Sequence, residues 1–145
     1  PGFSSATAWH QDVRYWSFDR PDLITAWIAL GREERTQGAL RVLPQSHRLE
    51  LDRGRLDKDL FLRPERPENK KMIRQSKEIE LNAGDVLLFH AQLFHAAGKN
   101  LTDTPKFSVV FSYHGDTNLP IPGTRSAKLP SFAVVRNVKT SDSTK

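Results

Sequence analysis

The apolar residues of this chain come in short runs separated by proline, glycine and polar residues. Most runs are rich in aromatic and β-branched side chains, which favour strands. Residues 23–30 form an almost continuous apolar run that a buried helix would also show, but its composition favours a strand. We therefore predict strands at residues 7–18, 23–30, 39–44, 73–81, 86–94, 107–113 and 132–138.

Polar segments separate these runs. Residues 48–71 are charged and contain two prolines, which predicts a long surface loop with about one turn of helix. Residues 115–130 contain three prolines and predict another loop, and the polar residues 139–145 predict a disordered tail. We expect a single all-β domain over residues 1–138, a sandwich or barrel. The alternative is an α+β domain, if residues 23–30 were helical.

Length and composition narrow the possible chemistry. The chain has 145 residues and a mass of 16.5 kDa, enough for one buried core. It contains no cysteine, so any metal must be held by histidine, aspartate or glutamate. No apolar run approaches the roughly 20 residues of a transmembrane helix, and the first residues lack a secretory-signal pattern. We therefore expect no membrane partner and a cytoplasmic location.

The chain is basic, with a formal net charge of +5. Such a balance can indicate nucleic-acid binding, which would be strongly salt-dependent. The lysines and arginines are, however, spread along the chain rather than clustered, and no known nucleic-acid module is present. We therefore expect no nucleic-acid partner.

The histidines carry the most specific chemical signal. His10 and Asp12 are two residues apart, and on a strand such residues point to the same face. A third imidazole from His90 or His95 would complete a set of two histidines and one carboxylate. That set leaves coordination positions open and suits non-haem Fe(II), which must bind a co-substrate and O₂. For each histidine alone, the alternative is a half-buried side chain with ordinary hydrogen bonds.

Several separated motifs, in this order, resemble the phytanoyl-CoA dioxygenase family of Fe(II)- and 2-oxoglutarate-dependent oxygenases. The resemblance covers about residues 9–115 and rests on Trp-His-Gln-Asp, Trp-Ile-Ala-Leu, Gly-Ala-Leu-Arg-Val-Leu-Pro-Gln-Ser-His, Gly-Asp-Val-Leu-Leu-Phe-His and His-Ala-Ala-Gly-Lys-Asn. It implies a double-stranded β-helix, or jelly roll, and Fe(II), 2-oxoglutarate and O₂ as cofactor and co-substrates.

The resemblance also implies roles for particular residues. The family's metal ligands correspond to His10, Asp12 and His95, because His95 opens the segment that matches the family's distal histidine motif. Trp27 corresponds to a tryptophan near the co-substrate, and Gln11 to a glutamine near it.

Two positions depart from the family pattern. Lys106 stands eleven residues after His95, where the family has an arginine that holds the far carboxylate of 2-oxoglutarate. Ala97 replaces a serine, so a hydroxyl partner for that carboxylate is missing. Lysine supplies one compact cation and no bidentate fork. We expect Lys106 to contact the co-substrate, although a solvated lysine at a strand start would look the same.

The chain begins nine residues before His10, so we expect the family's usual N-terminal part, which includes helices, to be missing from this sequence. The implied activity is hydroxylation or another oxidation of a C–H bond in a small molecule, with release of succinate and CO₂. Asp12 supports this, because halogenating relatives replace the carboxylate with a small residue.

The basic residues at 48–71 would suit an anionic substrate, but a solvated loop is the other interpretation. The alternative function is a degenerate, non-catalytic metal-binding jelly-roll module. The sequence does not fix the oligomeric state.

Overall fold

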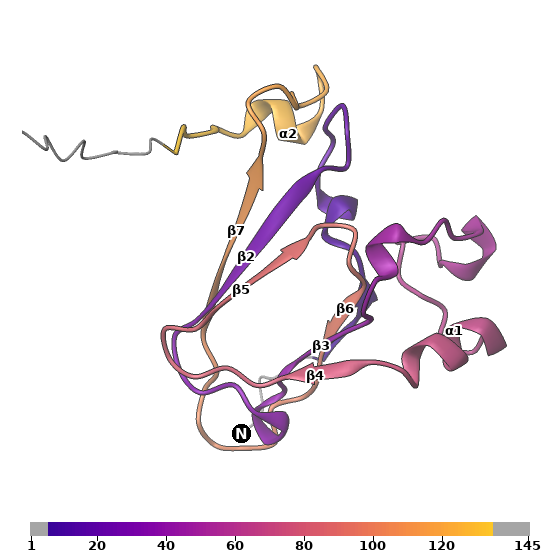
Figure 1. The fold of residues 1–145 in the computed structure, drawn as a ribbon, viewed down its shortest axis with the longest axis vertical. Coiled ribbons are helices and arrows are strands. Elements are labelled where there is room, and N and C mark those ends of the chain that lie inside the picture. Colours follow the sequence, from indigo (N-terminus) through magenta and orange to yellow (C-terminus); the bar gives the residue numbers. More distant parts are fainter. Residues whose placement is uncertain (1–5, 135–145) are drawn as a thin grey trace, which may run out of the picture.

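The computed structural model describes residues 6–134, which form two antiparallel β-sheets that face each other (Figure 1). The first sheet has four strands in the order β1 (Thr7–His10), β6 (His95–Ala97), β3 (Leu40–Val42) and β4 (Lys77–Ile79). The second has three, in the order β5 (Val86–His90), β2 (Leu23–Ala29) and β7 (Ser108–His114). Except for β3 and β4, strands that follow one another in the chain lie in different sheets. This is the arrangement of a jelly roll, and the all-β prediction is confirmed.

Short helices connect the strands. The α-helices described are α1 (Pro67–Ile73) and α2 (Arg125–Lys128). The 3-10 helices are η1 (Asp12–Tyr15), η2 (Arg35–Gln37), η3 (Ser46–Arg48) and η4 (Arg53–Arg55). Among the residues that the structure describes, no helix is long and apolar enough to cross a membrane.

The core lies between the two sheets. Leu40 and Val42 of the first sheet pack with Phe89 of the second, and Trp27 is partly buried against them. A second cluster, centred on Trp9 and Phe94, extends this packing beneath the loop that follows β3. These contacts remove apolar surface from water and hold the sheets at a fixed spacing.

The other face of the three-stranded sheet is apolar and exposed. Residues 24, 26 and 28 of β2 point to that face, together with their partners on β5 and β7. Its large side chains, 41% to 65% exposed, are Ile24, Val86, Leu88, Phe111 and Tyr113. The face is therefore uncovered within residues 6–134.

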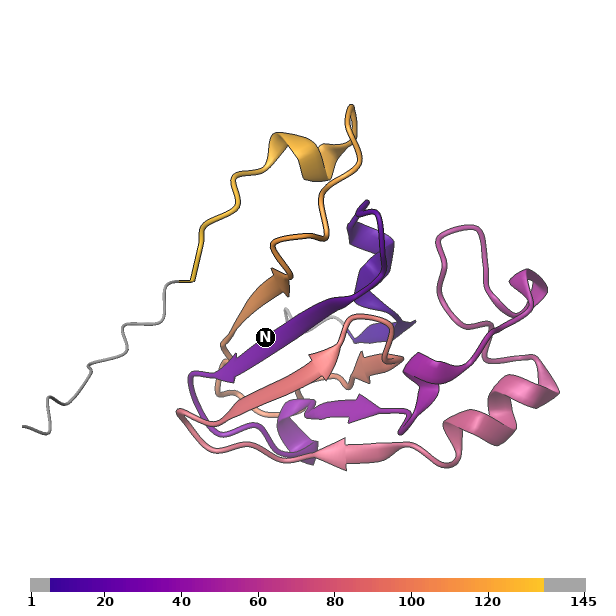
Figure 2. The ribbon, with the colours of Figure 1, turned by 45° about the horizontal axis from the view of Figure 1, so that its top comes forward.

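The predicted loop at residues 48–71 is more ordered than expected. It begins at the last residue of η3, contains η4 and the start of α1, and lies beyond the ends of β3 and β4 (Figure 2). Asn69 is fully buried and donates to the carbonyls of Arg55 and Arg63, both at 2.8 Å. The Arg55 Nε donates back to Asn69 Oδ1. Pro67 opens α1, where its missing N–H costs nothing.

Several strand limits differ from the prediction. The strand predicted at residues 7–18 ends at His10, because the backbone turns into η1. Residues 86–94 do not form one strand: β5 ends at His90, and after a turn β6 begins at His95 in the other sheet. The strand predicted at 73–81 shortens to β4, because α1 takes residue 73.

At the C-terminal end, α2 lies within the loop predicted at 115–130, and residues 132–134 of the strand predicted at 132–138 have no regular structure. The remainder of that strand and the predicted tail at 139–145 lie outside the described residues. The single-domain prediction over residues 1–138 stays a prediction.

Candidate metal centre

Three potential ligands meet where β1 and β6 lie side by side. His10 ends β1 and His95 begins β6, and the two residues are direct partners in the antiparallel register. Their ring centroids are 4.3 Å apart. Asp12 opens η1, and its Oδ1 lies 3.6 Å from His10 Nε2 and 3.4 Å from His95 Nε2. All three residues are buried, and their ligand atoms lie within 4.8 Å of one another.

Backbone contacts fix the orientation of both imidazoles. His10 Nδ1 lies 2.8 Å from Ala8 O, and His95 Nδ1 lies 3.0 Å from Leu93 O. Because a carbonyl oxygen only accepts, each Nδ1 donates to it, and each Nε2 faces Asp12 and is the nitrogen available to a metal. A hydrogen bond from one ring nitrogen to a backbone carbonyl is the usual support for a histidine that binds metal through the other.

The Asp12 carboxylate is held from the second sheet. Thr25 of β2 is fully buried, and its Oγ1 donates to Asp12 Oδ2 at 2.7 Å. Burial alone would raise the pKa of Asp12. Hydrogen bonds with the two histidines and Thr25, and the charge of His95, outweigh burial and hold that pKa well below its ordinary value. The group is therefore a carboxylate, the form that binds a metal.

The donor set fits a non-haem iron. Two imidazole nitrogens and one carboxylate oxygen converge on one side, and the described residues contain no other group of three such ligands this close together. A set of two histidines and one carboxylate is the facial arrangement that leaves positions free for small molecules. His90, the other candidate for the third ligand, lies outside this group.

Aromatic side chains surround the centre. The His10 ring contacts Tyr15 and Phe61 at centroid distances of 5.8 and 5.7 Å, and the His95 ring contacts Phe89 at 4.9 Å. Phe61 belongs to the basic segment at residues 48–71. That segment therefore reaches the centre through an aromatic side chain rather than through its arginines and lysines.

A cleft of about 650 Å³ adjoins the centre and has Asp12 in its wall. The other lining residues come from η1 and the residue after it, from β7 and from α2, and they are Tyr15, Trp16, Val110, Phe111, Ser112 and Arg125. The cleft is mostly apolar, with one cation, and its size suits a small organic molecule.

Lys106 and Trp27, both predicted to lie near the co-substrate, are in contact with each other. Lys106 Nζ lies 5.6 Å from the centroid of the Trp27 ring. It donates to Gly38 O at 2.7 Å and forms an ion pair with Glu33 Oε2 at 3.5 Å. The Lys106 side chain is 16% exposed, so it is not a solvated lysine.

Gln11 does not point at these residues. Its Nε2 donates to Gln92 O at 2.5 Å, in the turn between β5 and β6. This contact ties η1 to the turn that delivers His95. The predicted contact of Gln11 with a co-substrate stays a prediction.

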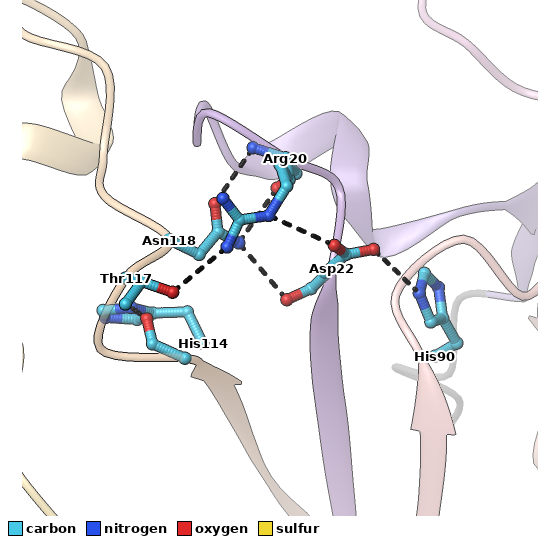
Figure 3. A network of polar contacts seen from close by, with 7 residues as sticks. Arg20, Asp22, His90, His114, Thr117 and Asn118 are labelled. Carbon is cyan, nitrogen blue, oxygen red and sulfur yellow. Dashed lines mark hydrogen bonds and ion pairs between the residues drawn. The ribbon is translucent and has the colours of Figure 1, made fainter.

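His90 belongs to a separate polar network (Figure 3). Its Nε2 lies 3.9 Å from Asp22 Oδ1, and Arg20 Nε lies 3.4 Å from Asp22 Oδ2. Asn118, fully buried, accepts from Arg20 N and donates to Arg20 O. His47 stacks on His90 at a centroid distance of 5.5 Å. The network joins the segment just before β2 to the end of β5 and to the segment that follows β7.

Burial and the neighbouring His47 lower the pKa of His90, and the Asp22 carboxylate only partly offsets them. A neutral imidazole that accepts from Gln92 N at 3.1 Å agrees with this direction.

Sequence reasoning missed three residues around the site. Thr25 lies within the apolar run at residues 23–30. A single hydroxyl in such a run is a sign of a buried hydrogen bond, and this sign was available in the sequence. Glu33 lies in the charged stretch Gly-Arg-Glu-Glu-Arg, which gives no sign of burial, yet its side chain is 0% exposed. Ser108 donates to Glu33 Oε1 at 2.6 Å, and nothing in the sequence pairs the two.

Comparisons of this chain with a family model and with curated proteins agree on one family. Residues 1–108 match the family described as phytanoyl-CoA dioxygenase (PhyH). The human peroxisomal phytanoyl-CoA dioxygenase is 33% identical over 101 residues, covering 64% of this chain and 29% of that protein. Phytanoyl-CoA dioxygenase 1 of Oryza sativa subsp. japonica is 25% identical over 109 residues, covering 75% of this chain and 39% of that protein. The chain thus spans well under half the length of these relatives.

The fold also matches solved structures. The epimerase SnoN, in complex with Fe³⁺, alpha ketoglutarate and nogalamycin RO, is 30% identical with a TM-score of 0.69. That match covers 92% of this chain and 55% of SnoN. EctD from S. alaskensis, solved with 2-oxoglutarate and 5-hydroxyectoine, has a TM-score of 0.68 at 23% identity and covers 83% of this chain and 43% of EctD.

Proposed function

The chain belongs to the phytanoyl-CoA dioxygenase family, and we propose that it carries the iron and 2-oxoglutarate site of an oxygenase that oxidises a C–H bond of a small molecule. The observation that carries the proposal is the buried group His10, Asp12 and His95, with both Nε2 atoms and one carboxylate oxygen facing one point. SnoN, which shares this fold at 30% identity, binds Fe³⁺ and alpha ketoglutarate, and this supports the same pair here.

Bound at these residues, iron would supply the oxidation of 2-oxoglutarate by O₂ to succinate and CO₂, coupled to hydroxylation or a related oxidation of the substrate. The chain's own residues prepare the site. Ala8 O and Leu93 O hold the two imidazoles in one tautomer, and Thr25 holds the carboxylate. Lys106 would receive the far carboxylate of 2-oxoglutarate beside the Trp27 ring.

The substrate would lie in the cleft beside Asp12. Trp16 and Val110 give it apolar walls, and Arg125 gives it one cation. We therefore propose a small substrate with an apolar body and an anionic group. Replacing Arg125 with glutamine should weaken binding of such a substrate and leave binding of 2-oxoglutarate unchanged.

The test is an anaerobic titration of the Fe(II)-loaded protein with 2-oxoglutarate, followed by the visible charge-transfer band and by calorimetry. We expect saturable binding and a band that disappears in His10→Ala. His114→Ala is the matched control, because this histidine lies at the end of β7 outside the group of ligands, and it should keep the band.

A specific observation also supports the alternative of a non-catalytic metal-binding module. Position 97 carries no hydroxyl, and Lys106 already pairs with a carboxylate of the chain itself. One outcome refutes the oxygenase proposal: Fe(II) binding depends on His10, Asp12 and His95, but 2-oxoglutarate neither binds nor gives the band. The chain is then better described as a non-catalytic metal-binding module.

A further inference from the structure

Glu33 is a fully buried carboxylate at the Lys106 end of the site. Its side chain is 0% exposed. The Trp27 Nε1 donates to both of its oxygens, at 3.1 and 3.2 Å, and the Ser108 hydroxyl donates to Oε1 at 2.6 Å. Lys106 Nζ completes the set at 3.5 Å. A buried carboxylate with this many partners is held in place rather than free to turn away.

The Lys106 ammonium is therefore largely committed within the chain. It has three N–H donors, of which one goes to Gly38 O and another faces Glu33. One donor is left for an incoming group. The charge of the ammonium is also balanced, because the Glu33 carboxylate sits within ion-pair distance in a site shielded from water.

This pair lies on the same side of the sheet as the candidate metal centre. Thr25 and Trp27 are two residues apart on β2, so their side chains point to the same face and their Cα atoms are roughly 7 Å apart. Thr25 contacts Asp12, and Trp27 contacts Glu33 and Lys106. A short 2-oxo acid bound at Asp12 would thus direct its far end toward Glu33 and Lys106.

We infer that Glu33 determines which 2-oxo acid this site accepts. Its carboxylate repels the far carboxylate of 2-oxoglutarate, so a 2-oxo acid with an uncharged tail can compete with 2-oxoglutarate for the site. The inference rests on the proposed function, because it assumes that a 2-oxo acid binds beside Asp12. An acid with two carboxylates must share Lys106 with Glu33 and place two negative charges side by side. An acid with an uncharged tail avoids that repulsion and leaves the ion pair intact.

The size of the effect follows from Coulomb's law. For two unit charges roughly 6 Å apart at an effective dielectric of about 20, the interaction corresponds to well over tenfold in affinity. Neutralising Glu33 should therefore strengthen 2-oxoglutarate binding by about tenfold or more. Binding of 2-oxobutyrate, which has the same 2-oxo acid head and an uncharged tail, should change by less than about twofold, since no charge pair is involved.

The experiment measures anaerobic binding of 2-oxoglutarate and of 2-oxobutyrate to the Fe(II)-loaded protein by calorimetry. The variants are the wild type, Glu33→Gln and the matched control Glu34→Gln. Glu34 is the neighbouring carboxylate, but it pairs with Arg32 at the surface and its side chain is 35% exposed. Gln keeps the shape of Glu and still accepts from Trp27, and the thermal midpoint of each variant shows whether it is folded.

We expect the wild type to bind the two acids within about tenfold of each other, Glu33→Gln to gain affinity for 2-oxoglutarate alone, and Glu34→Gln to match the wild type. If the wild type instead prefers 2-oxoglutarate by about a hundredfold, the inference is overturned without any variant. It is also overturned if Glu33→Gln weakens 2-oxoglutarate binding or tightens both acids equally, because Glu33 then only positions Lys106. Binding of neither acid to any variant would refute the proposed function itself.

Discussion

The hydrogen bond from Thr25 to Asp12 allows a quantitative prediction for Thr25→Val. The substitution keeps a β-branched side chain of similar size on β2 and removes only the hydroxyl that donates to Asp12 Oδ2 at 2.7 Å. Both residues are buried, with Thr25 0% and Asp12 9% exposed, so water cannot replace the lost donor well.

Hydrogen bonds to charged groups contribute about 1.5–3 kcal/mol. We therefore expect the free energy of unfolding of the metal-free protein to fall by about 2 kcal/mol, which lowers the urea midpoint by about 1 M. Because Thr25 also fixes the carboxylate that faces the histidines, metal affinity should fall by about tenfold. Urea denaturation and calorimetric titration with Fe(II) or Mn²⁺ measure the two effects.

Thr36→Val is the matched control. Thr36 Oγ1 donates to the Glu34 carboxylate at 2.8 Å, but this pair is exposed, so stability and metal affinity should stay within about 0.5 kcal/mol of the wild type. If Thr25→Val is as stable as this control and binds metal equally well, the buried hydrogen bond does not support the site and the reasoning fails.

Three further predictions concern the rest of the domain. Gly38→Ala should lower the free energy of unfolding by at least about 2 kcal/mol in urea denaturation, because φ is +74° and the new Cβ would lie 2.4 Å from Gly98 O. The pKa of His90 is lowered from 6.5, so its contribution to stability is lost as pH falls below 6.5, where the unfolded chain takes up the proton more readily. His47→Gln removes one cause and should raise the pKa of His90 in an NMR titration. Asn69→Ala removes the two hydrogen bonds that the buried Asn69 amide donates to the carbonyls of Arg55 and Arg63, so limited proteolysis at residues 53–66 should accelerate.

Each of these has a comparison that can contradict it. Gly84→Ala has a φ of +90° but nothing within 4 Å of the new Cβ, so a loss as large as that of Gly38→Ala would rule out the steric explanation. Asp22→Asn should lower the pKa of His90 further, and a rise would contradict the assigned charges. Unchanged cleavage in Asn69→Ala would show that its hydrogen bonds do not hold the loop.

The strands that sequence reasoning located best are those whose composition and burial agree. Residues 23–30 and 107–113 are rich in β-branched and aromatic side chains and lie in the middle and at the edge of one sheet, and both predictions are within one residue of the structure. The division of residues 86–94 could not be predicted, because the turn at 91–92 contains neither glycine nor proline. The chain changes sheets there through backbone hydrogen bonds that no periodicity reveals.

The candidate site was foreseeable only in part. The spacing of His10 and Asp12 suggested one shared face, although Asp12 in fact lies in η1 after the strand has ended. The choice of His95 came from the resemblance, and the structure places it beside His10 through strand register, which is a long-range property. The burial of Glu33 could not be predicted, because its partners come from two segments far apart in the sequence: Trp27 on β2, and Lys106 and Ser108 just before and at the start of β7.

The two sheets divide the candidate site between them. The three potential ligands belong to segments of the four-stranded sheet, whereas Trp27 belongs to the three-stranded sheet and Lys106 comes just before its last strand. The packing of Leu40 and Phe89 sets the spacing of these sheets. The length of a molecule that contacts both the three potential ligands and the Trp27–Lys106 pair therefore depends on that spacing. Substitutions that make the core side chains smaller or larger would change the distance between the sheets. They should change the preferred length of such a molecule more than they change metal affinity.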